Sequence, residues 1–342
     1  GMPIGFAVGI AGTVGLYLIG GLNLALGILS VAPYRNTASW LLTAIPLFIL
    51  MAEILSASRI SSDMFRAANR WVGHLPGGLA VATVFTSAGF GAVSGSSTAA
   101  TATMARTVAP EAEKYGYDRG MIVGTVAAAG TLSIMIPPSV VLMVYGIITE
   151  TSIGGLFIAG ILPGLITALS FAGITMVWAT LNRDLAPPVQ SHGWRERFAS
   201  LRDIWPVVLL FVFVVAGIYS GAVTVTEAAA VGCFGAIMIA AVLLRRMGWR
   251  EFMGALERTT RPTAMIFTII IGAHIFGYFV TLTMAPQALV SYVQGLEIGP
   301  GVVILILILI YILLGCVMDQ LAILILTMPI VFPMVLELGY SP

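Results

Sequence analysis

Two short stretches, Gly91-Ala92-Val93-Ser94-Gly95-Ser96-Ser97 and Gly315-Cys316-Val317-Met318-Asp319, look like two copies of one element. The first lies in a long uncharged run that ends near Arg106, and the second lies in an apolar run from Ile298 to Leu336 whose only charged residue is Asp319. Their first glycines are separated by 315 − 91 = 224 positions. The two stretches therefore predict an internal repeat.

Other landmarks keep nearly the same separation and the same order along the chain. They are Gly77 and Gly301 (224), Gly116-Tyr117 and Gly339-Tyr340 (223), and Gly9 and Gly232 (223). The chain has 38 glycines, so one such coincidence means little, but an ordered set is unexpected. Long repeats in inverted surroundings are typical of secondary transporters, whose binding site lies where the copies meet.

The composition predicts an all-α polytopic membrane protein. The 342 residues are 59% hydrophobic and 9% charged, with a mean hydropathy of +1.03, which is more apolar than soluble domains are. Apolar runs long enough to cross a membrane recur to the end of the chain, so a cleavable signal peptide does not explain them. The runs cover about 5–32, 38–57, 121–147, 156–181, 205–222, 228–244 and 263–284. A net charge of +1 gives no hint of nucleic acid, and Cys233 and Cys316 indicate packing rather than a disulfide or a metal site.

The basic residues predict the orientation. They collect in four groups, at 59–70, 106–119, 183–202 and 245–261, and the positive-inside rule places these loops in the cytoplasm. A hairpin at about 76–112, turning near Ser94–Ser97, has basic residues on both sides and would enter from the cytoplasm. A hairpin at about 301–337, turning near Met318–Leu321, has none and would enter from outside. Two re-entrant hairpins of opposite direction are what an inverted repeat requires.

The same alignment divides the chain. Residues 1–181 form the first repeat, 182–204 a polar cytoplasmic linker, and 205–342 a truncated second repeat. On this alignment we expect one helix to be missing before Gly1 and at least two after Pro342.

The first turn is rich in small hydroxyls, and Ser94, Ser96 and Ser97 lie at its centre. Irregular backbone at membrane depth is tolerated only where it is buried or lines a cavity. Hydroxyl and carbonyl oxygens are suited to an alkali cation, and helix N-termini facing the turn favour a carboxylate. The alternative is close helix packing through small residues.

A second irregular site is expected in Ser133-Ile134-Met135-Ile136-Pro137-Pro138-Ser139, midway along the run 121–147. Two prolines there remove backbone donors and break the helix. A broken helix beside a hairpin tip is the usual partner in an ion site. The alternative is a simple kink, with the Ser139 hydroxyl bonded back to the chain.

Asp319 is the only acidic residue between Glu297 and Glu337. A carboxylate at membrane depth costs about 2.5–3.5 kcal/mol on insertion scales, so it needs a partner or a function. Near Gly315, at the second turn, it would complete a cation or substrate site. The alternative is an ordinary helix N-cap.

These motifs resemble the large membrane (M) subunit of tripartite ATP-independent periplasmic (TRAP) transporters. The resemblance covers essentially the whole chain, and its motifs are Ala44–Phe48, Ser94–Ser97, Ile136–Ser139, Thr224–Ala228 and Gly315–Asp319 with Pro329 and Pro333. It implies an elevator-type fold in the bacterial inner membrane, driven by two or more sodium ions. It also implies a small membrane (Q) subunit, surrounding lipid, and a periplasmic binding protein that delivers an organic acid.

The motifs and the resemblance together predict two sets of site residues, for a protein that is not an enzyme. Sodium ligands are expected at Gly91, Ser96, Ser97, Pro137, Ser139, Gly315 and Asp319. Substrate contacts are expected at Ser94, Gly95, Ser96, Pro138, Ser139 and Asp319.

Three other functions remain open at this point. A related sodium–carboxylate carrier would work without a binding protein. A channel could also use paired re-entrant hairpins, and it would pass current without a sodium gradient. An intramembrane protease could use Ser94 as its nucleophile, with His74 or His274 as its base.

Overall fold

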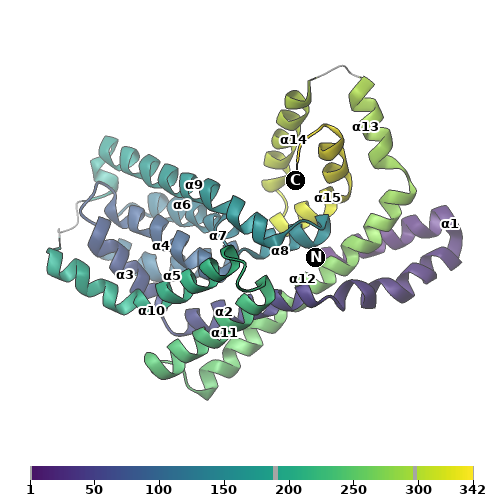
Figure 1. Ribbon diagram of the computed structural model, residues 1–342. Coiled ribbons are helices and arrows are strands. Elements are labelled where there is room, and N and C mark those ends of the chain that lie inside the picture. The colour runs from purple at the N-terminus through teal and green to yellow at the C-terminus, as the bar shows by residue number, and fades with distance from the viewer. Residues whose placement is uncertain (1, 188–191, 296–298, 342) are drawn as a thin grey trace. The chain divides into compact units, whose positions relative to one another are not determined.

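The computed structural model describes residues 2–187, 192–295 and 299–341, and this part of the chain contains helices and no strand (Figure 1). Positions 1 and 342, and residues 188–191 of the predicted linker, therefore lie outside the described residues. The helices are α1 (Ile4–Thr37), η1 (Trp40–Thr43), α2 (Ala44–Ala57), α3 (Ile60–Val72), α4 (Gly78–Ser94), α5 (Ser97–Lys114), α6 (Arg119–Gly130), α7 (Leu132–Met135), α8 (Val140–Thr149), α9 (Ile153–Leu181), η2 (Arg183–Leu185), α10 (Trp194–Tyr219), α11 (Val225–Ile237), η3 (Met238–Leu243), α12 (Trp249–Leu282), α13 (Ala285–Gly295), α14 (Pro300–Gly315) and α15 (Gln320–Glu337). The all-α prediction is confirmed.

Seven helical segments of the described chain are long and apolar enough to cross a membrane, or eight if the bent pair α6–α7 and α8 counts as one span. The seven are Ile4–Thr37, Trp40–Ala57, Ile153–Leu181, Trp194–Tyr219, Val225–Leu243, Trp249–Leu282 and Gln320–Glu337. α4 and α14 are apolar but shorter. Short apolar helices followed closely by a second helix fit the predicted hairpins in length, while their direction in the membrane stays a prediction.

Several helices extend beyond the apolar runs that predict them. α10 begins at Trp194 rather than near 205, and α12 begins at Trp249 rather than near 263. Hydropathy marks the part of a helix that lies in hydrocarbon, whereas backbone hydrogen bonding continues the helix into polar sequence. Much of the predicted linker is therefore the first turns of α10.

The chain forms two compact units. One unit contains residues 43–143 and 152–260, and α4 lies at its centre. α4 contacts α2, α3, α5, α6, α7 and α9, and Leu79, Val81 and Phe90 are among its buried side chains. Small residues let these helices approach closely, which is how helices associate in a membrane.

Tyr117, in the loop between α5 and α6, supports the beginning of α4. Its hydroxyl accepts a hydrogen bond from the Leu79 N–H at 3.3 Å. Burial raises the pKa of this phenol above its usual value, so it remains neutral. A neutral phenol thus satisfies a backbone donor at the start of the helix.

The other compact unit contains residues 1–42, 144–151 and 261–342. Within it, α1 packs on α12 through a cluster that includes Leu16, Ala25 and Ile275. The hydroxyls of Tyr311 on α14 and Thr327 on α15 are 2.6 Å apart, which joins these two helices. Both units draw residues from the predicted first and second repeats, so compactness does not follow the repeat boundaries.

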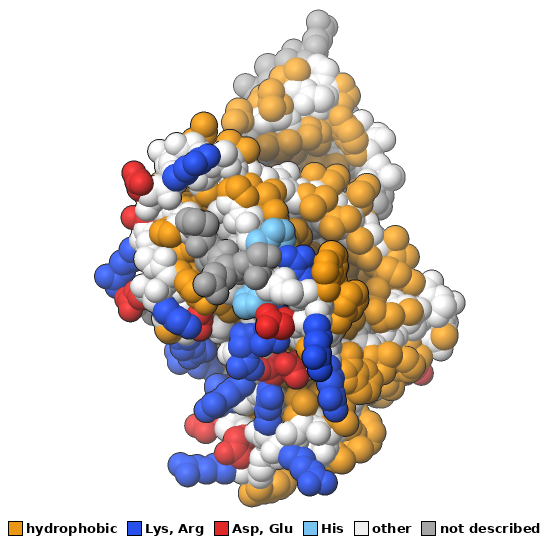
Figure 2. Space-filling view, turned by 90° about the vertical axis from the view of Figure 1, so that its left-hand side faces the viewer, with side chains coloured by type: hydrophobic (Ala, Val, Ile, Leu, Met, Phe, Trp, Pro, Cys, Tyr) orange, Lys and Arg blue, Asp and Glu red, His pale blue; other side chains and the backbone are white. Residues whose placement is uncertain are grey.

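The surface is divided by polarity. Figure 2 shows charged side chains gathered on one part of the visible face and hydrophobic side chains over most of the rest. Large apolar residues are exposed along α1, α9 and α10, for example Leu18, Leu162 and Leu209. Exposed apolar surface of this extent is expected of a chain whose helices meet lipid or other membrane subunits.

Candidate functional site

The first hairpin turns where the sequence predicts it. α4 ends at Ser94 and α5 begins at Ser97. Gly95 adopts a left-handed conformation with φ +59°, and its N–H donates to the Gly91 carbonyl at 2.8 Å. Ser96 caps α5, because its Oγ accepts from the Ala99 N–H at 3.4 Å. A glycine in the left-handed region followed by a serine cap is a common way to end one helix and begin another.

The second irregular site breaks a helix, also as predicted. α7 ends at Met135, Ile136 is extended, the Pro137–Pro138 peptide is cis, and α8 begins at Val140. The segments on either side of the break are bent by 43°. The prolines leave donors and acceptors near the break without helical partners.

Ser139 satisfies part of this break itself. It is fully buried, and its Oγ donates to the Ile134 carbonyl at 2.7 Å and accepts from the Leu142 N–H at 3.3 Å. This is the back-bonding alternative that the sequence left open. These two bonds use the hydroxyl proton and one lone pair of the Ser139 oxygen, and they leave its second lone pair.

The structure brings the hairpin turn and the broken helix into contact. A Cβ at Gly91 would lie 2.6 Å from the Ser133 Oγ, and a Cβ at Gly95 would lie 2.7 Å from the Pro138 carbonyl oxygen. The Val140 N–H also donates to the Gly95 carbonyl at 3.4 Å. Only glycine permits backbone to approach this closely. Gly91, Gly95, Pro138 and Ser139 therefore form one neighbourhood, as the sequence predicts.

Ser133 is the unexpected member of this neighbourhood. Its side chain is fully buried, and among the described residues its Oγ has no hydrogen-bond partner. An unsatisfied buried hydroxyl costs about 1–3 kcal/mol, so it calls for an explanation. The sequence does not single out Ser133 as a site residue, and its position four residues before Pro137 is the signal that could have found it.

The remaining hydroxyls of the turn differ in exposure. Ser94 is buried, and its Oγ donates weakly to the Ser96 carbonyl at 3.4 Å. Ser96 is half-buried, with its Oγ 3.2 Å from that of Thr98. The Ser97 carbonyl lies against Gly130, at the end of α6. The hydroxyls of Ser94 and Ser96 thus have contacts within the turn, and the Ser97 carbonyl faces α6.

The second hairpin has a different tip. α14 ends at Gly315, and Asp319 is the N-cap of α15, with Oδ2 accepting from the Leu321 N–H at 3.0 Å. Both Gly315 and Asp319 are exposed. They belong to the other compact unit. The cap alternative is observed, and the cation role of Asp319 stays a prediction.

The two histidines considered as bases have other partners. His74 Nδ1 lies 3.3 Å from Arg197 Nη2, and His274 Nδ1 lies 2.8 Å from the Ile270 carbonyl. The Ser94 hydroxyl bonds to backbone. No described contact joins Ser94 to a histidine, as a serine nucleophile would require.

The family model of the DctM component of tripartite ATP-independent periplasmic transporters matches residues 1–342. The chain belongs to this family. This confirms the resemblance that the sequence motifs indicated. With its membrane-spanning helices, the chain is a multi-pass inner-membrane transport protein.

Curated relatives of this DctM component agree. The C4-dicarboxylate large permease protein DctM of Pseudomonas aeruginosa is 35% identical over 314 residues, covering 92% of this chain and 73% of that protein. The sialic acid large permease protein SiaM of Vibrio cholerae is 29% identical over 344 residues, covering 100% and 79%. The isethionate permease protein DctMQ of Oleidesulfovibrio alaskensis is 30% identical, covering 100% and 53%.

A solved structure shares the fold. The Alcanivorax borkumensis YdaH transporter superposes with a TM-score of 0.66 over 99% of this chain and 82% of that one. The sequences are 13% identical, so this likeness concerns the fold alone.

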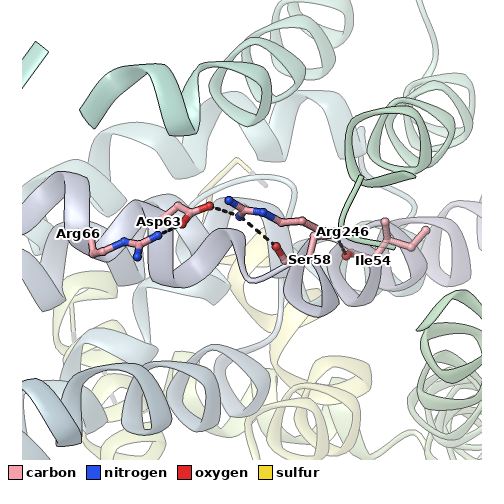
Figure 3. Close-up of polar contacts among 5 residues, drawn as sticks. All are labelled: Ile54, Ser58, Asp63, Arg66 and Arg246. Carbon is pink, nitrogen blue, oxygen red and sulfur yellow. Dashed lines mark hydrogen bonds and ion pairs between the residues drawn. The ribbon is translucent and has the colours of Figure 1, made fainter. Parts of the chain in front are cut away.

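An ion-pair network that the sequence did not predict lies on α3, a helix that packs against α4 and α5 of the hairpin (Figure 3). Asp63 on α3 is 3% exposed and pairs with both Arg66 and Arg246. Arg246 also donates to the Ser58 carbonyl at 3.4 Å. Two arginines compensate a carboxylate that has lost its water. The network ties the α2–α3 junction, which precedes the hairpin, to the segment after η3.

Proposed function

We propose that this chain is the permease subunit of a sodium-driven transporter that takes up a small organic acid by an elevator mechanism. Membership of the tripartite family supports the general part of this proposal, which is secondary uptake with a periplasmic binding protein. Relatives are named for C4-dicarboxylate, sialic acid and isethionate, which supports a small organic anion as substrate. The family resemblance also supports a small Q subunit as partner, and one relative bears the composite name DctMQ.

One observation carries the sodium site: the buried, unpartnered Ser133 hydroxyl faces Gly91 at the contact between turn and break. Sodium prefers several neutral oxygens, and broken helices supply them as unwound carbonyls. We assign the first site to the hydroxyls of Ser96, Ser97 and Ser133, with carbonyls of Gly91 and the segment 137–139. A bound cation would satisfy Ser133, whose unpaired oxygen is otherwise costly.

The second sodium site would use Asp319 and carbonyls near Gly315. A carboxylate needs a partner at membrane depth, and no arginine or lysine follows Arg261 in this sequence. The residues that we propose for the substrate are Ser94, Gly95, Ser96, Pro138 and Ser139 at the first hairpin, and Asp319 at the second. Helix N-termini at both turns would favour its negative charge.

The orientation is proposed from charge. Cysteines at Lys114 and Gly299, both exposed positions, should react with an impermeant thiol reagent from opposite sides of the membrane. Reaction from the same side would contradict the inverted repeat.

Reconstitution tests the function directly. The complete complex in liposomes should accumulate a radiolabelled organic acid only with an inward sodium gradient and only with the binding protein. Uptake without the binding protein would instead support the carrier alternative. Sodium-independent current would support a channel.

A further inference from the structure

A hollow of about 310 Å³ lies beside the first hairpin, within one compact unit. Ser94 and Phe90 of α4 line it at the turn, and Thr103 and Arg106 line it along α5. Glu53 of α2 and Arg258 of α12 complete its wall. It therefore contains hydroxyls at one end and charged groups along its side.

A second hollow of about 560 Å³ continues the first, because both are lined by Ser56, Thr103 and Arg106. The second hollow is further lined by Arg59, Arg66 and Glu111, and the two arginines belong to the basic group 59–70. The two hollows together lead from the hairpin turn to Arg59 before α3 and Arg66 on α3, and Arg106 lies where they meet.

The charges along this path are unequally paired. Arg258 Nε donates to Glu53 Oε2 at 2.7 Å, and these side chains are 52% and 22% exposed. Arg66 pairs with Asp63. Arg106 is exposed and has no ion-pair partner among the described residues. The junction of the hollows therefore carries an uncompensated positive charge.

We propose that Arg106 and Arg258 bind the carboxylate of the transported anion as it passes along the two hollows. Arginine matches a carboxylate with two parallel N–H donors. Glu53 competes with the substrate for Arg258 and so keeps binding there weak enough to release it. The identity of the anion rests on the proposed function, whereas the positive charge along the two hollows does not.

Charge-selective labelling tests the path without transport. Ala102 is exposed and lines the first hollow. The test uses the purified complex with Ala102→Cys, in a background of Cys233→Ala and Cys316→Ser. The rate ratio of the anionic sulfonatoethyl methanethiosulfonate to the cationic trimethylammonioethyl reagent should be higher than the same ratio for a small free thiol. Arg106→Gln should lower this rate ratio by about threefold or more, as loss of one nearby, partly screened charge requires.

A matched control separates this effect from net charge. Ala199 of α10 is exposed and lines neither hollow, so at Ala199→Cys the ratio should not change with Arg106→Gln. Glu53→Gln should raise the ratio at Ala102→Cys, because it frees Arg258. An unchanged ratio at Ala102→Cys in both variants would overturn the proposal.

Transport provides the second readout. Succinate loaded inside the liposomes should inhibit net succinate uptake. The internal succinate concentration that halves uptake should rise about threefold or more in Arg106→Gln, and it should fall in Glu53→Gln. Arg119→Gln, an exposed arginine outside both hollows, should behave like the original chain. Changes of the same direction in Arg106→Gln and Glu53→Gln would overturn the proposal.

The two readouts separate this inference from the proposed function. If the complex moves no organic acid, the proposed function fails. The labelling ratios still test the anion path in that case, as does a lower labelling rate at Ala102→Cys when succinate is added. If transport is sodium-driven but the ratios do not respond, only the anion path fails.

Discussion

The two hairpins share an element order but differ in their surroundings. α4 and α14 begin 300 − 78 = 222 positions apart, and α5 and α15 begin 320 − 97 = 223 positions apart. Almost every residue of α4 is buried, whereas Val303 is the only buried residue of α14. The first turn offers neutral hydroxyls and packs on a broken helix, and the second offers one carboxylate that caps α15. Similar local sequence signals therefore break the helix at corresponding positions, while packing depends on what each hairpin meets.

The largest expected effect is at the support of the first hairpin. Asp63→Ala should lower the free energy of unfolding by about 1.5–3 kcal/mol, because it removes the charged hydrogen bonds to Arg246 and Arg66, whose side chains are 40% and 64% exposed and stay hydrated. Asp184→Ala, in exposed η2, should change it by less than about 0.5 kcal/mol. Denaturant or thermal unfolding of the purified protein measures both. Equal effects would mean that the network does not hold the α2–α3 junction.

A pair of glycines compares the hairpins themselves. Gly91→Ala should destabilise the protein by about 1–3 kcal/mol, since the new methyl would collide with Ser133. Gly315→Ala meets nothing within 4 Å and replaces a helical glycine, so stability should stay the same or rise by up to about 1 kcal/mol. Thermal unfolding in parallel is the measurement. If both variants lose stability equally, the two hairpins do not differ in packing at these glycines.

How far the sequence predicts this molecule depends on the kind of contact. Gly95, Pro137 and Pro138 determine backbone conformation locally, so the break and the first turn were predicted at the correct residues. The second break falls at 316–319 rather than 318–321, because Asp319 caps α15 and so ends the turn. Boundaries of this kind depend on which side chain captures a backbone N–H.

Other features were beyond sequence reasoning. Asp63 reads as an ordinary interfacial charge, and its partner Arg246 is 183 positions away. Ser133 becomes notable only when α7 packs against Gly91 and leaves its hydroxyl without a partner. Long-range partners and unsatisfied groups are properties of packing and have no local signature.

A carboxylate variant sharpens the chemical difference between the tips. Asp319→Asn keeps the capping oxygen, so stability should change by less than about 0.5 kcal/mol. If Asp319 binds sodium, the sodium concentration for half-maximal uptake should rise about threefold or more, because a charged ligand is lost. Normal uptake at limiting sodium would leave Asp319 as a helix cap.

The hydroxyls of the first turn should give a smaller effect each. The double variant Ser96→Ala, Ser97→Ala should raise the half-maximal sodium concentration, and loss of the α5 cap should cost about 0.5–2 kcal/mol of stability. Ser96→Asp with Ser97→Ala restores the cap and serves as the stability control. Unchanged sodium activation in both variants would remove these hydroxyls from the ion site.

Sodium-dependent stabilisation of Ser133 and Ser87 variants tests the central claim most directly. Both serines are fully buried, and neither hydroxyl has a hydrogen-bond partner among the described residues, but only Ser133 lies against Gly91 at the turn. Thermal unfolding of the purified protein in sodium and in potassium chloride measures sodium binding. We predict that Ser133→Ala loses about 0.5–1.5 kcal/mol of the sodium-specific stabilisation and that Ser87→Ala retains all of it. Equal sodium-specific stabilisation in both variants would contradict a sodium ion at the first hairpin.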